Sequence, residues 1–197
     1  LPFGQRFIPG HEYMGTVAAL GPDVDEYAVG DRVAVEIHAG CGQCRRCRSG
    51  MYTSCHNYGL NYAGRDKGHR ANGFTTNGGF AQYVVNHVNT LVRVPEGMSD
   101  AEAALAVTAG TSIYGLTEMG GLVAGESVAV IGPGPIGLLA AAVAKALGAD
   151  PVILVGTREN RLQIGRQLGA DHLVNAREAD PVETVKGLTG NVGVDYV

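Results

Sequence analysis

The four cysteines of this chain all lie within residues 41–55, at Cys41, Cys44, Cys47 and Cys55. Thiolates bind Zn²⁺ at about 2.3 Å, and four of them complete a tetrahedral structural site that takes no part in chemistry. Glycines in this segment allow tight backbone turns, and its arginines offset the negative charge of a zinc tetrathiolate. We interpret the segment as a structural zinc site that holds one lobe of the protein in shape.

Two other uses of the cysteines are weaker. Two disulfides would suit a secreted protein, but the sequence shows no signal peptide. An iron–sulfur cluster of the bacterial ferredoxin type requires the spacing C-x2-C-x2-C-x3-C, whereas seven residues separate Cys47 from Cys55 here. Structural zinc is therefore the favoured interpretation, and any catalytic group must lie elsewhere in the chain.

A second candidate metal site lies near the start of the chain, where His11 and Glu12 are adjacent. The zincin helix H-E-x-x-H would need a second histidine at position 15, which is glycine, so a metalloprotease is unfavoured. An imidazole and a carboxylate can both bind one metal ion, or Glu12 can orient His11 from behind. Taken alone, the pair favours a purely structural role in the core over metal binding.

A glycine-rich segment follows the apolar run at residues 127–131 and has the pattern G-x-G-x-x-G. In a strand–turn–helix context this pattern binds a dinucleotide, because the glycines let pyrophosphate approach the backbone and the helix N-terminus favours anions. A turn that binds no ligand is the alternative. The predicted cofactor-binding residues are Gly132, Pro133, Gly134, Pro135, Ile136 and Gly137.

The next predicted strand ends in Val155-Gly156-Thr157-Arg158, where an NAD site would carry an acidic residue. Arg158 could pair with a 2′-phosphate, assisted by the Thr157 hydroxyl and by Arg161. An arginine forms a stronger, charge-assisted hydrogen bond with a phosphate than with a neutral ribose hydroxyl. We therefore predict that NADP is favoured over NAD. A solvated start of a helix is the alternative interpretation.

Composition excludes several classes of partner. The chain has 197 residues with 15 Lys and Arg against 19 Asp and Glu, a net charge of −4, and no long basic run. Nucleic acid is therefore not an expected partner. No apolar run approaches the ~18 residues that a membrane span requires. A cytoplasmic location is expected.

The pattern of the chain predicts an α/β protein with two domains, at residues 1–98 and 99–197. The first part is β-rich, with strands expected at residues 15–20, 32–37, 80–85 and 90–93. Ser99 and Glu102 form a predicted capping box that starts one helix running to Met119. Helices then alternate with strands, which indicates a doubly wound parallel sheet with strands at residues 127–131, 152–155, 172–174 and 194–197.

The order of these motifs resembles that of the zinc-containing medium-chain dehydrogenases, which include alcohol, polyol and threonine dehydrogenases. The resemblance rests on Gly10-His11-Glu12-x2-Gly15, Gly30-Asp31-Arg32-Val33, the cysteine segment, Gly78-Gly79-Phe80-Ala81 and the glycine-rich loop. It implies a GroES-like catalytic domain joined to a Rossmann domain, with a catalytic zinc in the cleft between them. Because Leu1 is not a Met and Val197 ends within an expected strand, we expect a fragment that is inactive alone.

The resemblance also implies roles for individual residues. His11 would bind the catalytic zinc, with Glu12 as a ligand or close neighbour, while the family's first cysteine ligand lies upstream of His11. Thr108 occupies the position of a third ligand but is a poor one, so it would contact substrate or nicotinamide, or pack as a small core residue. Ser112 would face the nicotinamide, and His38 resembles a histidine near the active site of threonine dehydrogenases.

The implied activity is hydride transfer between a nicotinamide cofactor and a secondary alcohol, polyol or amino alcohol, or the corresponding ketone. The alternatives are a simple primary-alcohol dehydrogenase of the same family, a zinc-free reductase, a non-catalytic homologue that binds dinucleotide, and a zinc-ribbon interaction module. The resemblance also implies a homo-oligomer, a dimer or a tetramer. The partners expected are small alcohol or ketone substrates, with zinc and NADP as cofactors.

Overall fold

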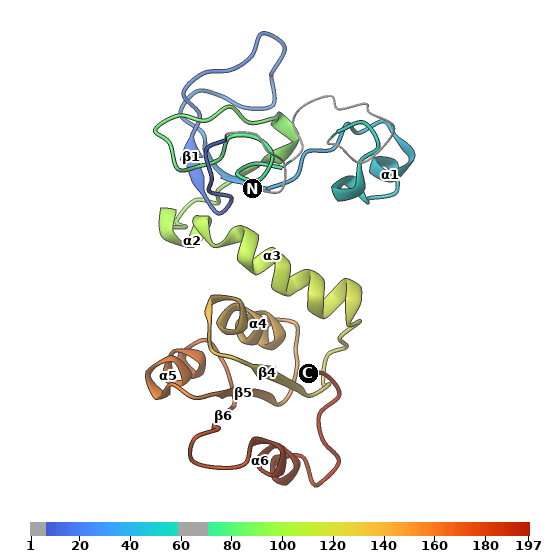
Figure 1. Ribbon diagram of the computed structural model, residues 1–197, viewed down its shortest axis with the longest axis vertical. Helices are drawn as coiled ribbons and strands as arrows, with labels where there is room; N and C mark the ends of the chain where they lie inside the picture. The colour runs from blue at the N-terminus through green and yellow to red at the C-terminus, as the bar shows by residue number, and fades with distance from the viewer. Residues whose placement is uncertain (1–6, 59–70) are drawn as a thin grey trace. The chain divides into compact units, whose positions relative to one another are not determined.

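The computed structural model describes residues 7–58 and 71–197, and the chain forms two compact units, Leu1–Val107 and Thr108–Val197 (Figure 1). The first unit is mostly irregular, with a small antiparallel sheet. The second alternates strands and helices around a parallel sheet. The domain ranges 1–98 and 99–197 stay a prediction about the whole protein.

The sheet of the first unit has three strands in the order β1 (Met14–Thr16), β2 (Arg32–Val35) and β3 (Leu91–Arg93). Both pairs are antiparallel, and Val33 and Val35 of the central strand are buried. The strands expected at residues 15–20, 32–37 and 90–93 are therefore present but shorter. Thr90, the first residue of the strand expected at residues 90–93, belongs instead to the 3₁₀ turn η2 (Val88–Thr90).

The strand expected at residues 80–85 is absent from the described structure, so this prediction is wrong. The segment is mostly apolar and aromatic, as many strands are, but an extended segment becomes a strand only through backbone bonds to a partner. No strand among the described residues pairs with it. Phe80, Tyr83 and Val85 are accordingly exposed.

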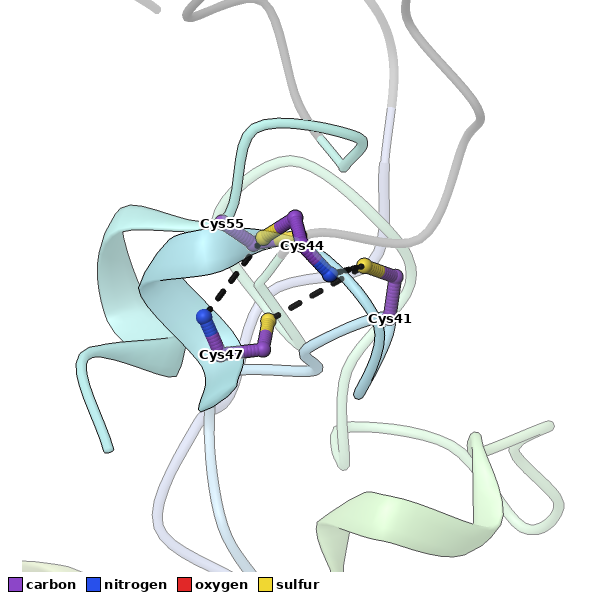
Figure 2. A group of neighbouring side chains, drawn as sticks. All are labelled: Cys41, Cys44, Cys47 and Cys55. Atoms are coloured by element: carbon purple, nitrogen blue, oxygen red, sulfur yellow. Dashed lines mark hydrogen bonds between the residues drawn. The ribbon is translucent and has the colours of Figure 1, made fainter. Parts of the chain in front are cut away.

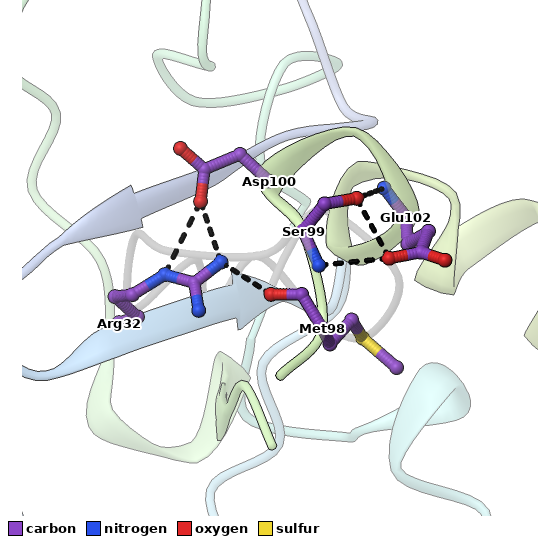
Figure 3. A network of polar contacts seen from close by, with 5 residues as sticks. All are labelled: Arg32, Met98, Ser99, Asp100 and Glu102. Carbon is purple, nitrogen blue, oxygen red and sulfur yellow. Dashed lines mark hydrogen bonds and ion pairs between the residues drawn. The ribbon is translucent and has the colours of Figure 1, made fainter. Parts of the chain in front are cut away.

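Helix α2 (Asp100–Ala104) begins at the predicted capping box and is fastened to the sheet. The Ser99 hydroxyl accepts a hydrogen bond from the Glu102 N–H at 3.3 Å, and the Glu102 carboxylate accepts one from the Ser99 N–H at 2.8 Å (Figure 3). Arg32 of β2 donates to the Asp100 carboxylate at 2.6 Å and to the Met98 carbonyl at 2.8 Å. The first turn of the helix is thereby held against β2 within this unit.

The single helix expected from Ser99 to Met119 is instead divided, so that prediction is wrong in detail. Helix α2 ends at Leu105, whose N–H bonds only three residues back to Glu102. Helix α3 (Ala106–Tyr114) then passes into the π-helical turn η3 (Gly115–Met119), where bonds reach five residues back. The alanine-rich composition favours helix throughout but does not determine which hydrogen-bond spacing each turn adopts.

The sheet of the second unit has three parallel strands in the order β4 (Val128–Ile131), β5 (Val152–Gly156) and β6 (His172–Asn175). The central strand β5 is buried along its whole length, as expected for a strand with both neighbours paired and both faces covered. Its side chains alternate, with Val152 and Leu154 in one apolar cluster and Ile153 and Val155 in the other.

Helices cover both faces of this sheet, which confirms the predicted Rossmann-type architecture. Helices α4 (Pro135–Ala146) and α5 (Glu159–Gln167) lie on one face, and α6 (Pro181–Leu188) lies on the other (Figure 1). Ala141, Ala144 and Leu162 fill the first cluster, and Val185 packs against the second. None of the helices in the described part of the chain is long and apolar enough to cross a membrane.

The last expected strand, at residues 194–197, is reduced to one isolated bridge. Tyr196 lies parallel to Val128, and its carbonyl accepts a hydrogen bond from the Ala129 N–H at 2.9 Å. The carboxylate of the neighbouring Asp195 accepts hydrogen bonds from the N–H and the hydroxyl of Ser127 at 2.8 and 2.7 Å. The segment therefore lies next to β4, but it makes too few ladder bonds to form the predicted strand.

Asp171 connects the helical layer to the sheet. Its carboxylate accepts hydrogen bonds from Lys145 at 2.7 and 2.9 Å and from the backbone N–H of Val152 at 2.8 Å. Partial burial raises the pKa of Asp171, but the Lys145 ammonium and the Val152 N–H outweigh it, so the net pKa lies below the usual value. The carboxylate is therefore stabilised in its charged form.

We expect Asp171→Asn to lower the free energy of unfolding by about 1–2 kcal/mol at pH 7, because a neutral amide loses the charge-assisted bonds. A lowered folded pKa means that this contribution is present above the unfolded pKa of about 3.9 and is lost as the pH falls through the folded value. Urea unfolding at pH 7 and pH 3 should show the two proteins converging in acid. Asp150→Asn, at an exposed carboxylate 3.9 Å from Lys145, should change little at either pH.

Candidate metal centres and cofactor site

The four cysteine sulfurs converge in the first unit, and Figure 2 shows their side chains turned toward one centre. All four Sγ atoms lie within 4.8 Å of one another, and those of Cys41 and Cys47 are 4.0 Å apart. The short helix α1 (Arg45–Arg48) carries Cys47, and the 3₁₀ turn η1 (Tyr52–Ser54) delivers the fully buried Cys55. Among the described residues, this is the one group of three or more potential metal ligands.

The spacing of the sulfurs fits a metal tetrahedron. Zinc–sulfur bonds of 2.3 Å place neighbouring sulfurs about 3.8 Å apart, whereas a disulfide requires about 2 Å. All four cysteines are free. Backbone N–H groups of Cys44 and Cys47 donate to the sulfurs of Cys41 and Cys44 at 3.4 and 3.5 Å, and the Asn57 side chain donates to Cys41 at 3.2 Å. Such donors stabilise thiolates, which are the form that binds metal.

The thiols differ in acidity. Burial raises the pKa of Cys41. Hydrogen bonds from the backbone N–H groups of Gln43 and Cys44 and from Asn57 outweigh this effect and lower the pKa to about 6. Burial together with the neighbouring Cys44 raises the pKa of Cys47 to about 12. Four adjacent thiolates also repel one another, which disfavours the fully ionised cluster. A divalent cation would relieve that repulsion.

His11 and Glu12 form the second candidate centre. The His11 Nε2 and Glu12 Oε1 atoms are 3.9 Å apart, and the two side chains are 38% and 52% exposed. A nitrogen and an oxygen donor at this separation fit a shared zinc ion after a small side-chain adjustment. In the described residues they do not gather a third histidine, cysteine or acid into a cluster. The structure brings these two side chains together, and their role as zinc ligands stays a prediction.

The segment before His11 is held by unusually close backbone packing. A Cβ atom on Gly78 would collide with the Gly10 carbonyl, and one on Gly73 would collide with the same group. Hydrogen bonds join the Gly78 N–H to Ile8 at 2.7 Å and the Gly79 N–H to the Gly10 carbonyl at 2.9 Å. Residues 73–79 therefore determine where His11 lies.

The predicted glycine-rich loop adopts the shape that a dinucleotide site requires. It leaves β4 at Ile131 and enters α4 at Pro135, with Gly134 as the N-cap residue. A Cβ on Gly137 would collide with the Gly132 carbonyl, so only glycine permits this turn. A Cβ on Gly134 would meet nothing within 4 Å, which leaves that side of the loop open. The first N–H groups of α4 lack intrahelical partners and form an anion site there.

Thr108 and Ser112 lie on one side of α3 and are buried. The Ser112 hydroxyl lies 3.2 Å from the Thr108 carbonyl and 3.3 Å from the carbonyl of Ile136. With one hydrogen to share between two acceptors, Ser112 fastens α3 to the first turn of α4, directly behind the glycine-rich loop. Their expected contacts with nicotinamide, substrate or zinc stay predictions.

Thr157 and Arg158 follow β5 and are exposed at the start of α5, where Arg158 is the N-cap residue. The prediction of no acid at this tip overlooked Glu159, the next residue. Its carboxylate accepts hydrogen bonds from Gln163 at 2.7 Å and from Asn175 at 3.4 Å, so its charge is engaged with α5 and β6. The sequence itself shows this acid directly after Arg158.

Sequence reasoning also missed one partner of the cysteine sulfurs. Asn57 donates to two of them, through its backbone to Cys55 at 3.4 Å and through its side chain to Cys41. Only the folded backbone brings the Asn57 side chain to Cys41, 16 positions earlier in the sequence. His38, which the resemblance places near an active site, lies 3.6 Å from the Glu36 carboxylate, and its hydrogen bond lowers the pKa of Glu36 despite burial.

Comparison with known proteins identifies the family. Residues 1–96 match the alcohol dehydrogenase GroES-like domain, and residues 135–197 match the zinc-binding dehydrogenase domain. The chain belongs to the zinc-containing medium-chain dehydrogenases. The family assignment confirms the resemblance and the predicted pair of domain types, and it supports zinc and a nicotinamide as the cofactors.

Individual relatives agree with the family. The chain is 36% identical to sorbitol dehydrogenase of Bacillus subtilis over 189 residues, and 37% identical to L-threonine 3-dehydrogenase of Pyrococcus horikoshii over 188. These matches cover 96% and 95% of the chain but 50% of each relative. The chain therefore spans about half the length of the curated relatives it matches.

Solved structures share the fold. The crystal structure of an NAD-dependent alcohol dehydrogenase superposes with a TM-score of 0.83 at 29% identity, over 95% of this chain and 52% of that one. A Sinorhizobium meliloti protein bound to NADP superposes with a TM-score of 0.77 at 29% identity, over 95% and 50% of the two chains. Neighbours with either nicotinamide thus have this fold.

Replacing Gly137 by Ala should weaken both the fold and cofactor binding, because the new Cβ collides with the Gly132 carbonyl. We expect a loss of about 1–3 kcal/mol in unfolding free energy. Gly134→Ala is the matched control, since a Cβ there meets no protein atom within 4 Å. It should weaken NADP binding while leaving the urea midpoint almost unchanged. Equal stability losses in both variants would contradict this account of the loop.

Proposed function

We propose that the protein containing this chain is a zinc-dependent oxidoreductase that transfers a hydride between a nicotinamide and a secondary alcohol or polyol. The observation that carries the proposal is the presence, in one chain of this family, of a four-sulfur cluster, a His–Glu pair and a glycine-rich turn opening a helix. The relatives named for sorbitol and for carbon 3 of threonine act on molecules with secondary hydroxyl groups. Both the proposed activity and its substrates concern the full-length protein.

We assign a structural zinc ion to Cys41, Cys44, Cys47 and Cys55. The support is the fit of the sulfur spacing to a tetrahedron and the N–H groups directed at the sulfurs. The cluster closes around its centre and leaves no open position for a substrate. Its role is to hold residues 41–55, which contain only one short helix and one 3₁₀ turn, in a defined shape.

The catalytic zinc is assigned to His11 and Glu12. When bound, such an ion acts as a Lewis acid toward the substrate oxygen, and the nicotinamide accepts or donates the hydride. This chain contributes the His11 imidazole nitrogen and the Glu12 carboxylate oxygen. Both lie on a segment that close packing of glycine backbones holds in place. Holding ligands in advance reduces the ordering cost of binding.

The second unit supplies the cofactor site. The N–H groups at the start of α4 would hold the pyrophosphate, and the Ser112 hydroxyl keeps that turn fastened to α3. For the preference between nicotinamides we favour NADP, because Arg158 is exposed at the tip of β5 while the neighbouring Glu159 is engaged by Gln163 and Asn175. The guanidinium is thus available to a 2′-phosphate.

One second candidate function has its own support. It is a non-catalytic homologue that binds dinucleotide, because the glycine-rich turn that opens α4 suits a dinucleotide whether or not a second metal ion is bound. Zinc content separates the two, because only the enzyme needs a second ion. The homo-oligomeric state and the cytoplasmic location expected from the sequence stay predictions.

The full-length protein should contain two zinc ions per chain, measured by plasma mass spectrometry after dialysis. His11→Ala should lower the content to one and abolish turnover, because the cysteine cluster is independent of His11. Cys55→Ser should lose the other ion and lower the melting temperature. A single ion in the unsubstituted protein, together with normal dinucleotide binding, would favour the non-catalytic homologue instead.

Arg158→Ala should lower the ratio of kcat/KM with NADP to kcat/KM with NAD by about 10- to 100-fold, the value of a hydrogen bond between charged groups. Arg166→Ala, which removes the same charge near the other end of α5, is the matched control and should leave the ratio within twofold. An unchanged ratio in Arg158→Ala would contradict the proposed 2′-phosphate contact.

A further inference from the structure

An aromatic ring lies against the imidazole of His11. The ring centroids of Phe74 and His11 are 4.4 Å apart, and the two planes are inclined by 34°. Both side chains are partly exposed, and the whole Phe74 residue is 44% exposed. A large apolar ring that stays in water on one side and covers an imidazole on the other is not explained by core packing.

The turn that carries Phe74 is strongly constrained. The carbonyl of Ala71 accepts hydrogen bonds from the N–H groups of Phe74, Thr75 and Thr76 at 3.0–3.2 Å, and the Gly73 N–H returns to the Thr76 carbonyl at 3.0 Å. The hydroxyl of Thr75 accepts a further bond from the Ala71 N–H at 3.1 Å. Residues 71–76 therefore form a self-bonded turn with little freedom to move Phe74.

The turn is also fastened to its surroundings. The fully buried Asn72 donates through its backbone to Ile37 at 2.8 Å and through its side chain to Glu36 at 3.1 Å. The Gly73 backbone packs directly on Gly10, the residue before His11. The turn thus fixes both the backbone that carries His11 and the ring that covers its side chain.

We propose that Phe74 is a positioning residue for His11, holding its imidazole in the orientation that binds the catalytic metal. The inference rests on the proposed zinc site at His11 and Glu12. With the Phe74 ring on one face, rotation of the imidazole about its Cβ–Cγ bond is hindered, because a perpendicular ring would collide with it. The plane of the imidazole is thereby held, with Nε2 3.9 Å from the Glu12 carboxylate oxygen.

The alternative is that Phe74 merely covers apolar surface. In that case any apolar side chain would serve, and the state of the imidazole would not respond to the loss of the ring. Positioning predicts a different result, because an aromatic pair contributes attraction and orientation beyond the area it buries. Leucine and methionine keep apolar volume but remove the ring, whereas tyrosine keeps the ring.

The test uses the full-length protein and its Phe74→Leu and Phe74→Tyr variants. The dissociation constant of the second zinc ion, measured by competition with a chelator, should rise about 2- to 10-fold in Phe74→Leu. It should stay within twofold in Phe74→Tyr. In the zinc-free proteins labelled with ¹³C-histidine, the ring-current shift of the His11 Cε1 proton should vanish with leucine and persist with tyrosine.

The control is Tyr83→Leu, which removes an exposed aromatic ring from the same unit and should leave both measurements unchanged. Phe74→Met repeats the test if the leucine variant fails to fold. Unchanged zinc affinity in a folded Phe74→Leu protein would overturn the proposal while leaving the zinc site intact. A single zinc ion in the unsubstituted protein would overturn the site itself, and with it the role of Phe74.

Discussion

Both candidate binding segments depend on backbone approaching backbone more closely than a side chain permits. At the cofactor loop, Gly137 packs against the Gly132 carbonyl, and this contact brings the start of α4 under the end of β4. Near His11, Gly73 and Gly78 both pack on Gly10. In each case the close contact shapes a short loop next to the candidate site. The positions of the anion site and of the imidazole follow from these contacts.

The cysteine lobe follows a different constraint, because its shape depends on shared ligands rather than on packing. Residues 41–58 contain one four-residue helix and one 3₁₀ turn, and only Cys55 among the cysteines is buried. Such a segment buries too little apolar surface to order itself. N–H groups directed at the sulfurs, with the Asn57 amide among them, prepare the cluster for a cation. We therefore expect metal binding and local folding to be one process in this segment.

The reach of sequence reasoning differs between the two units. In the second unit the helices and the strands β4 to β6 are where periodicity and glycine punctuation predict them, because each strand is buried by its neighbours along the chain. In the first unit the strand expected at residues 80–85 is absent, although its residues are mostly apolar and aromatic. A strand exists only when a partner accepts its hydrogen bonds, and no residue's own propensity contains that information.

The sequence by itself determined the kinds of chemistry available: a four-thiolate cluster from cysteine spacing, a dinucleotide turn from its glycines, and an α/β second unit from apolar runs separated by helices. These depend on residue type and short spacing, which the local chain sets. Tertiary structure decided what lies beside each group. It placed Phe74 on His11, 63 positions apart in sequence, Asn57 on the cysteine sulfurs, and Ser112 behind the glycine-rich loop. Such contacts arise from loop closure and packing between distant segments, which a local pattern does not specify.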